Sequence, residues 1–198
     1  MSYDLVVAVY KEELSWLKQR NYPDETIYAY RKFERFDYDF EDNLPNIGRE
    51  SHTFIYHFLK YYNNFTSDYL MLLQGNPHYH LPKEFDNPAT KIFYKKSEAT
   101  CLHYPLGKLR VCNSLGRPFS HWDCELYTFW HELFGVEMPI EFVAIFGAQQ
   151  IVHKDLITLR SKKFWEKALA LHTQEAHAPW AFEILWSYIF DPRIKGII

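Results

Sequence analysis

Three short polar segments of this chain carry residue types that bind small charged ligands. They are Tyr10 to Glu12, Asn46 to Arg49, and Gln74 to His80. The first and third follow apolar runs that are typical of buried strands, and the second precedes a helical pattern. Because ligands of largely parallel sheets bind beyond the carboxyl ends of the strands, we expect all three segments on one rim.

Arg49 and Glu183 are the charged residues best placed for chemistry. Arg49 stands at the expected start of a helix, where backbone N–H groups and the helix dipole favour an anion. Its alternative role is a helix cap or a salt bridge with Glu50. Glu183 lies one turn into the last expected helix, with Trp180 and Trp186 three residues to either side. Burial among these rings would raise the pKa of its carboxyl, whereas the alternative is an exposed carboxylate beside core tryptophans.

The elements expected around these residues are those of an α/β protein. Residues 5–9 are apolar at every position, which is typical of a strand covered on both faces. Further strands are expected at 25–30, 68–73 and 142–152, the last with a bend at Gly147. Helices are expected at 12–18, 49–61, 124–134, 161–172 and 179–190. The acidic run 37–42 is expected as a solvated loop, and residues 81–123 mostly as loops across one face.

The composition is that of one globular domain. Of the 198 residues, 47% are hydrophobic and 24% are charged, which excludes intrinsic disorder and allows a sizeable core. The formal net charge is −3, so broad binding to a phosphate backbone is disfavoured and no nucleic-acid partner is expected.

The cysteines and the apolar segments favour a cytoplasmic protein. Cys101, Cys112 and Cys124 are odd in number and too widely spaced for a zinc knuckle or a disulfide framework. The first residues lack the basic segment of a signal peptide. No apolar stretch approaches the ~20 residues that a membrane span requires.

In the order of its motifs the chain resembles the GT-A glycosyltransferases, which transfer a sugar from a nucleotide-sugar donor. Residues 5–14 are similar to the family's opening strand and the turn that cradles the nucleotide base. Residues 46–49 and 67–74 resemble its N-x-G turn and its DYVLFLD strand, which a helix separates. Residues 146–155 and 179–183 are similar to its acceptor-side strand and its late Trp-Glu helix start. The resemblance is closest to a branch that includes capsid-glycan glycosyltransferases of large algal viruses.

This resemblance implies a single GT-A-like, Rossmann-like domain over residues 1–198, with a mixed, mainly parallel sheet flanked by helices. Residues 1–80 would bind the nucleotide and residues 81–198 the acceptor. The implied donor is a nucleotide-sugar, with UDP as the family's commonest nucleotide, and the acceptor is a glycan or glycoprotein. The residues implied in donor binding are Ala8, Tyr10, Glu12, Asn46, Arg49, Gln74, Gly75, Asn76 and Trp180.

One position departs from the family. Where its members hold a divalent metal ion with an Asp-x-Asp motif, this chain reads Gln74-Gly75-Asn76, so both carboxylates are missing. Asn76, His78, His80 and, by its position in the family, His177 would form a site richer in nitrogen, which favours Mn²⁺ over Mg²⁺. The alternative is that these are ordinary surface residues.

An inverting sugar transfer needs a carboxylate to take the proton from the acceptor hydroxyl. Glu183 is the first candidate for this base, and Asp123 and Glu125 are its rivals. Two other functions stay open. A catalytically inactive nucleotide- or sugar-binding module is favoured by the missing Asp-x-Asp, and a metal-dependent hydrolase would use His78 and His80.

Overall fold

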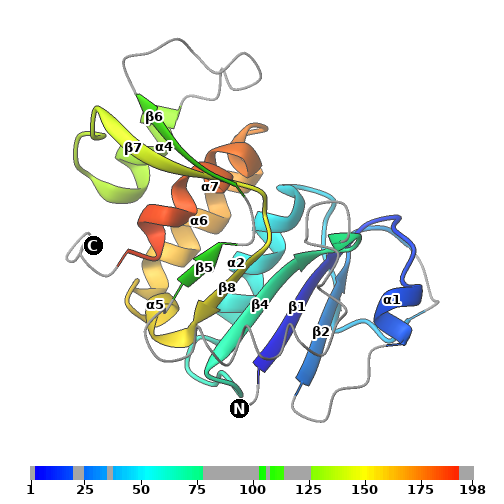
Figure 1. Cartoon of the computed structure of the whole chain (residues 1–198). Helices are drawn as coiled ribbons and strands as arrows, with labels where there is room; N and C mark the ends of the chain where they lie inside the picture. Colours follow the sequence, from blue (N-terminus) through cyan, green and yellow to red (C-terminus); the bar gives the residue numbers. More distant parts are fainter. Residues whose placement is uncertain are drawn as a thin grey trace.

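The computed structural model describes residues 3–19, 25–34, 38–77, 103–105, 108–113 and 126–191. In these residues a mixed sheet is flanked by helices, as the sequence predicts (Figure 1). The strand order of this sheet is β3-β2-β1-β4-β8-β5. Its strands are β1 (Tyr3–Val9), β2 (Glu25–Arg31), β3 (Asp42–Asn43), β4 (Tyr69–Gln74), β5 (His103–Pro105) and β8 (Gln150–His153). Strands β1 to β4 pair in parallel, whereas β8 is antiparallel to both β4 and β5.

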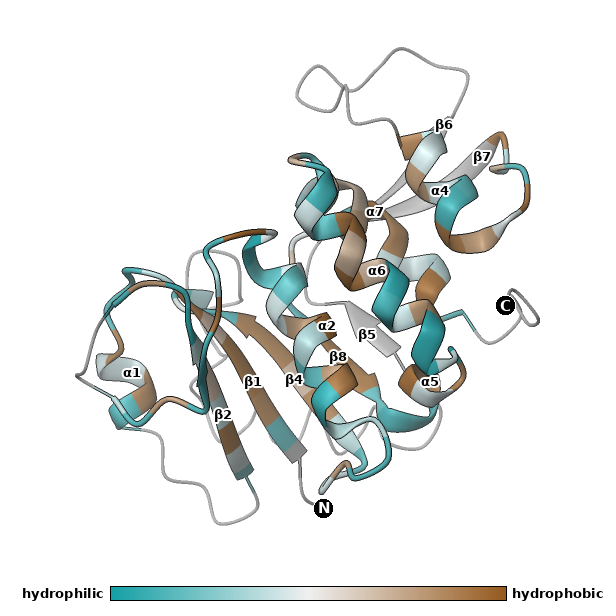
Figure 2. Ribbon diagram, turned by 180° about the vertical axis from the view of Figure 1, so that it is seen from behind, coloured by the Kyte–Doolittle hydropathy of each residue, from teal (hydrophilic) through white to brown (hydrophobic). Residues whose placement is uncertain are grey.

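The helices gather mainly on one face of the sheet. Figure 2, seen from behind, places α2, α5, α6 and α7 in front of the strands, with α1 at the far side of β2. The helices are α1 (Ser15–Lys18), α2 (Arg49–Tyr61), α4 (Leu126–Phe134), α5 (Lys154–Thr158), α6 (Lys162–Gln174) and α7 (Ala178–Ile189). In the described part of the chain, no helix has the length and apolar character that crossing a bilayer would need.

Strand β1 is buried on both faces, which explains why it is apolar at every position. Val6 and Ala8 pack in the core that α2, α4, α5, α6 and α7 cover. Leu5, Val7 and Val9 point to the other face and pack in a second core beside α1. Burying one such aliphatic side chain contributes roughly 1.5–3 kcal/mol, so β1 is the central apolar element of the fold.

The strand expected over 142–152 is wrong as a single element. It is two strands in two sheets, because β7 (Glu141–Phe146) pairs with β6 (Lys108–Asn113) and β8 pairs with β4 and β5. Gly147 separates them with φ at +121°, a conformation that side chains with a Cβ rarely adopt. A continuous apolar pattern cannot reveal such a break, although the glycine marks its place.

The expected boundaries need three further corrections. The helix expected from residue 12 begins at Ser15, because the Glu12 and Glu13 carboxylates accept hydrogen bonds from the Tyr10 and Ser15 N–H groups and form a turn. Residues 81–123, expected as loops, contain β5 and β6 among their described residues. Helix α5 was not expected; with five residues it is too short for a helical pattern to be visible.

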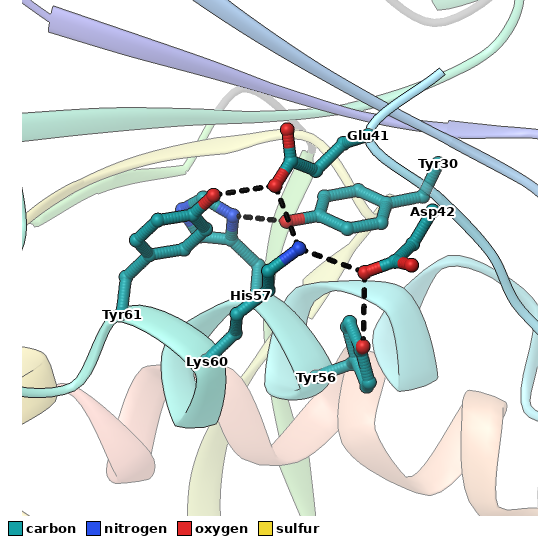
Figure 3. A network of polar contacts seen from close by, with 7 residues as sticks. All are labelled: Tyr30, Glu41, Asp42, Tyr56, His57, Lys60 and Tyr61. Carbon is teal, nitrogen blue, oxygen red and sulfur yellow. Dashed lines mark hydrogen bonds and ion pairs between the residues drawn. The ribbon is translucent and has the colours of Figure 1, made fainter.

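The acidic run 37–42 is also not simply a solvated loop, because its last residues are tied to α2 (Figure 3). Lys60 Nζ donates to Glu41 Oε1 at 2.6 Å and to Asp42 Oδ2 at 2.8 Å. Tyr61 and Tyr56 each donate their hydroxyl to one of the same two carboxylates. The edge strand β3 is thereby fixed to the last turns of α2.

A buried pair lies beneath this ion network. The Tyr30 hydroxyl lies 2.7 Å from His57 Nδ1, and both side chains are fully buried. Burial lowers the pKa of His57 to about 3, so a neutral imidazole shares this hydrogen bond with the Tyr30 hydroxyl. This contact joins β2 to the middle of α2 and helps to fix the helix on the sheet.

We expect Lys60→Met to lower stability by about 0.5–1 kcal/mol at pH 7, a small value because the three charged groups are partly exposed. The hydrogen bond from Lys60 is the main cause that lowers the pKa of Glu41 and of Asp42. Stability from lowered carboxyl pKa values is present above the unfolded values and is lost as the pH falls through the folded ones. Urea unfolding should therefore show a difference between wild type and variant that shrinks below about pH 4. Lys163→Met, at an exposed position of α6, is the control and should show no such pH dependence.

Candidate functional site

The carboxyl ends of β1 and β4 lie side by side and form one part of a rim, the edge where the parallel strands end. The Tyr10 N–H donates to Glu12 Oε2 at 2.6 Å, which folds the turn after β1 back on itself. A Cβ on Gly75 would lie only 2.6 Å from the same Glu12 oxygen, so the corner after β4 packs directly on this turn. Trp16 Nε1 also donates to the Gly75 carbonyl at 2.9 Å. The first and third polar segments are therefore in contact.

Lys32 brings the start of α2 to the same rim. It follows β2, and its backbone N–H donates to the last carbonyl of β1, that of Val9, at 2.7 Å. Its side chain is buried, and Nζ donates to the Ile47 carbonyl at 2.5 Å. The structure thus brings the three polar segments of the sequence together at one edge.

The chain enters α2 through two residues in the left-handed region. Gly48 has φ at +60° and Arg49 has φ at +45°. A Cβ on Gly48 would lie 2.6 Å from His52 Cβ and 2.6 Å from His172 Cδ2, so only glycine fits between these two side chains. Arg49, unlike glycine, carries a Cβ, so the left-handed conformation strains its backbone. This turn directs the Arg49 side chain away from the sheet and toward α7.

Arg49 and Trp180 come together where α2 meets α7. The Arg49 guanidinium carbon lies 5.5 Å from the centre of the Trp180 ring, close enough for a cation–π contact. Arg49 Nε also lies 3.8 Å from Glu50 Oε2, so the alternative ion pair with Glu50 is present. The Arg49 side chain nevertheless keeps 61% of its surface exposed. A guanidinium oriented in this way retains N–H groups for a ligand anion.

Glu183 faces the same junction from the second turn of α7. Its Oε1 accepts the Gly147 backbone N–H at 3.0 Å, which fixes one carboxylate oxygen. Burial is the main cause that raises the pKa of Glu183 to about 7, and the charge of Glu50 raises it further. The Gly147 hydrogen bond and the Arg49 charge act in the opposite direction. The raised pKa expected from the sequence is confirmed, and this carboxyl exchanges its proton near neutral pH.

Two buried histidines lie under the start of α2. His172 Nδ1 donates to the Ala168 carbonyl at 2.8 Å, so its Nε2 accepts the Ser51 hydroxyl at 2.7 Å. Burial lowers the pKa of His172 to about 3 and that of His52 to about 4. Both rings are therefore neutral and pack between α2 and α6, and His172 makes the two hydrogen bonds.

Several predicted site residues take other positions. Asn46 is exposed before α2, and Asn76 is exposed at the corner after β4, where its carbonyl accepts from Gln74 Nε2 at 2.9 Å. Ala8 is buried with its side chain in the core, so only its backbone can meet a ligand. His177 is exposed before α7, with its ring centre 6.0 Å from that of Trp180. Asp123, His78 and His80 lie outside the described residues.

The described residues do not by themselves fit a divalent metal ion. Among them, no group of three or more His, Cys, Asp or Glu side chains is arranged to hold one. Asn76 and His177, the described members of the expected set, each offer a single donor. The expectation of a metal site therefore depends on His78 and His80.

Sequence reasoning missed Lys32 and Phe33 on the rim. Both follow β2, and the rule that drew attention to the residues after β1 and β4 would have found them too. Phe33 keeps 45% of its surface exposed, and its ring centre lies 5.7 Å from that of Tyr10, which is 37% exposed. Lys11 Nζ lies 4.4 Å from the centre of the Phe33 ring. Two exposed rings and a cation thus stand together where β1 and β2 end.

Comparison of the chain with protein families, with curated proteins and with solved structures finds no match among any of them. The assignment of a function therefore rests on the sequence itself and on the geometry of the described residues.

We expect Glu183→Gln to make the protein more stable at pH 8. A carboxyl pKa raised from 4.5 to about 7 means that ionisation opposes folding, with a cost of about 3 kcal/mol once both states are ionised. Glutamine keeps an oxygen for the Gly147 N–H and carries no charge. The gain should decrease as the pH falls from about 7 to 4.5, because the folded carboxyl then takes up its proton before the unfolded one does.

Urea unfolding at several pH values measures this gain. Glu166→Gln, which alters an exposed carboxylate of α6, is the matched control and should change stability little at any pH. Equal stability of Glu183→Gln and wild type at pH 8 would mean that the Glu183 carboxylate is not buried as described.

Proposed function

We propose that this protein is a glycosyltransferase of the GT-A type that moves a sugar from a nucleotide-sugar, with UDP as the nucleotide, to a hydroxyl of a glycan or glycoprotein. The observation that carries the proposal is the junction of α2 and α7 at the rim. There an exposed guanidinium, Arg49, lies over the Trp180 ring, and a half-buried carboxyl, Glu183, follows Trp180 by three residues on α7. An anion site beside a base of near-neutral pKa is what a transfer from a diphosphate leaving group requires.

The donor end of the proposed site is the start of α2. A diphosphate there would meet the backbone N–H groups of the first turn, the favourable end of the helix dipole and the Arg49 guanidinium. The exposed rings of Tyr10 and Phe33 stand on the same rim, beyond β1 and β2. They suit a planar nucleobase, because an aromatic ring can stack on the face of any base.

The acceptor end is the region of Glu183. Its Oε1 is occupied by the Gly147 N–H, so Oε2 is the oxygen available to an acceptor hydroxyl. As that hydroxyl oxygen forms a bond to the anomeric carbon, its proton passes to Oε2, and the bond from the anomeric carbon to the phosphate oxygen breaks. The bonding electrons leave with the nucleoside diphosphate, and the configuration at the anomeric carbon inverts.

The remaining parts of the proposal come from the sequence. Residues 1–80 form the nucleotide-binding part and residues 81–198 the acceptor-binding part of one domain. The cysteine pattern favours action in a reducing compartment, the cytoplasm. Asn76, His78, His80 and His177 are the residues that would hold Mn²⁺.

We expect UDP to bind the protein with a measurable heat, and Arg49→Met to weaken that binding at least tenfold because the guanidinium contacts the diphosphate. Calorimetric titration with and without Mn²⁺ provides the measurement. Lys163→Met removes an exposed positive charge from α6 and should bind UDP like the wild type. Absence of UDP binding under both conditions would contradict the donor half of the proposal.

The same variants separate the alternative functions. A transferase should slowly hydrolyse its own nucleotide-sugar, and Glu183→Gln should reduce this rate at least a hundredfold, the lower end of what a general base contributes. A binding module would bind the donor without any hydrolysis. A metal-dependent hydrolase would cleave simple phosphoesters, with undiminished activity in Glu183→Gln.

The metal part has its own test. His78→Ala should weaken the Mn²⁺-dependent component of donor binding, because His78 follows the corner after β4 in the sequence. Thermal unfolding should stay unchanged. His131→Ala, at an exposed position of α4, is the control. An unaltered response to Mn²⁺ in His78→Ala would remove this residue from the ligand set.

A further inference from the structure

His172 of α6 contacts both of the helices that meet at the proposed site, α2 and α7. Its side chain is buried, and its Nδ1 donates to the Ala168 carbonyl, one turn earlier in its own helix, at 2.8 Å. This bond leaves Nε2 as a hydrogen-bond acceptor, and Nε2 faces α2. The bond to Ala168 therefore fixes the ring in one orientation, from which it reaches the two other helices.

On the α2 side, His172 holds the turn that carries Arg49. Its Nε2 lies 2.7 Å from the Ser51 hydroxyl, and Ser51 Oγ lies 3.0 Å from the Gly48 carbonyl. A Cβ on Gly48 would lie 2.6 Å from His172 Cδ2, so the ring also packs directly on the backbone of the turn. Arg49 stands between Gly48 and Ser51 in the chain. These contacts therefore fix the backbone from which its guanidinium extends.

On the α7 side, the same ring packs against Phe182. The two ring centres are 4.4 Å apart, and the angle between the ring planes is 40°. Phe182 is fully buried and directly precedes Glu183, and Trp180 lies two residues before Phe182. Because hydrogen bonds make a helix rigid over one turn, the contact at Phe182 also sets where Trp180 and Glu183 stand relative to α2.

The contact between Arg49 and Trp180 crosses the junction that His172 spans. Arg49 comes from α2 and Trp180 from α7, and the guanidinium carbon lies 5.5 Å from the ring centre. A cation–π contact acts only within about 6 Å, so it persists only while the two helices keep their separation. A buried side chain that touches both helices is suited to maintain that separation.

We propose that His172 is a positioning residue, which holds the first turn of α2 and the helix α7 at a fixed separation so that the two halves of the proposed site keep their geometry. This inference rests on the proposed function, in which Arg49 binds the diphosphate and Glu183 receives the proton of the acceptor hydroxyl. A displacement of about 1 Å between such groups can slow a reaction about a hundredfold. His172 does not touch the substrate in this account and acts only through Ser51 and Phe182.

The NMR signal of the Arg49 side-chain N–H group tests the inference without an activity assay. The ring current of Trp180 shifts this signal in the wild type, so Trp180→Leu should move it, and Arg49→Met should remove it and so assign it. Ser51→Ala breaks the link from His172 to α2, and Phe182→Leu removes the ring contact with α7. Each of these two variants should move the signal toward its position in Trp180→Leu.

Thr173→Ala is the matched control for Ser51→Ala. It also removes one hydroxyl from a helix, but Thr173 Oγ1 is exposed and donates to the Ala170 carbonyl of its own helix at 2.7 Å. The Arg49 signal should therefore stay in place in this variant.

Substitution of His172 itself adds a graded comparison. His172→Gln has an amide oxygen that can accept the Ser51 hydroxyl, so it should shift the Arg49 signal less than His172→Leu, which has no acceptor. Ser51→Ala and Phe182→Leu both retain the histidine, so the test does not depend on whether the His172 variants fold. An Arg49 signal that keeps its wild-type position in Ser51→Ala or in Phe182→Leu would overturn the inference.

Kinetics separate a positioning role from a contribution to stability alone. The proposed diphosphate contacts belong to α2, so Phe182→Leu should keep UDP affinity within about threefold of the wild type. Hydrolysis of the nucleotide-sugar should slow at least about tenfold, because that step needs both halves of the site in place. Lower thermal stability of Phe182→Leu with an unchanged rate at a temperature where the variant is folded would overturn the inference.

Failure of the inference is distinguishable from failure of the proposed function. The Arg49 signal does not depend on any donor, so an unmoved signal with intact UDP binding would remove His172 from its role and leave the function in place. Absence of UDP binding with a moved signal would remove the donor site and leave the link that His172 makes between α2 and α7.

Discussion

The first turn of α2 is the constraint on which the candidate site depends. Gly48 fits between His52 and His172 only because it lacks a Cβ, and the following residue, Arg49, also takes a left-handed conformation. Such a turn costs roughly 1–3 kcal/mol of strain for the residue that carries a side chain. The Lys32 ammonium on the Ile47 carbonyl and the packing of the two histidines hold it in place. Without this turn, the helix would begin in another direction and Arg49 would not meet Trp180.

Charged groups are buried around this turn, and the fold tolerates them for identifiable reasons. Lys32 is 6% exposed, and Glu183 is half-buried on α7. Isolated buried charges would cost several kcal/mol each, but here each group has a partner of opposite charge or a backbone hydrogen bond. The apolar cores on both faces of β1 supply the stability that offsets the remaining cost. Ionisable groups with such shifted pKa values are concentrated at functional sites more often than in ordinary cores.

The sequence could predict the elements and the rim because both follow local rules. Fully apolar strands, a glycine before α2 and polar residues at strand ends are visible along the chain, and the structure places them as those rules require. The division of 142–152 between two sheets was not predictable, because strand partners are set by tertiary packing and the apolar run is continuous. The role of Lys32 was hidden for a related reason. Its Nζ bonds to a carbonyl 15 residues away, and no periodic pattern records such a contact.

The proposed function is compatible with neutral side chains at the corner after β4, where the family that the sequence resembles has an Asp-x-Asp motif. Two carboxylates at the corner after β4 would repel a diphosphate unless a cation stood between them. Gln74 and Asn76 carry neutral amides instead, so this corner adds no repulsion. Under the proposed function, the positive end of α2 and the exposed Arg49 then attract the phosphates, while Glu183 on α7, whose pKa burial raises to about 7, receives the proton. The proposed function thus divides the rim into an anion-binding half at Arg49 and a proton-accepting half at Glu183, with the Trp180 ring beside Arg49. A site divided in this way can hold a leaving phosphate without neutralising the base that a transfer reaction needs.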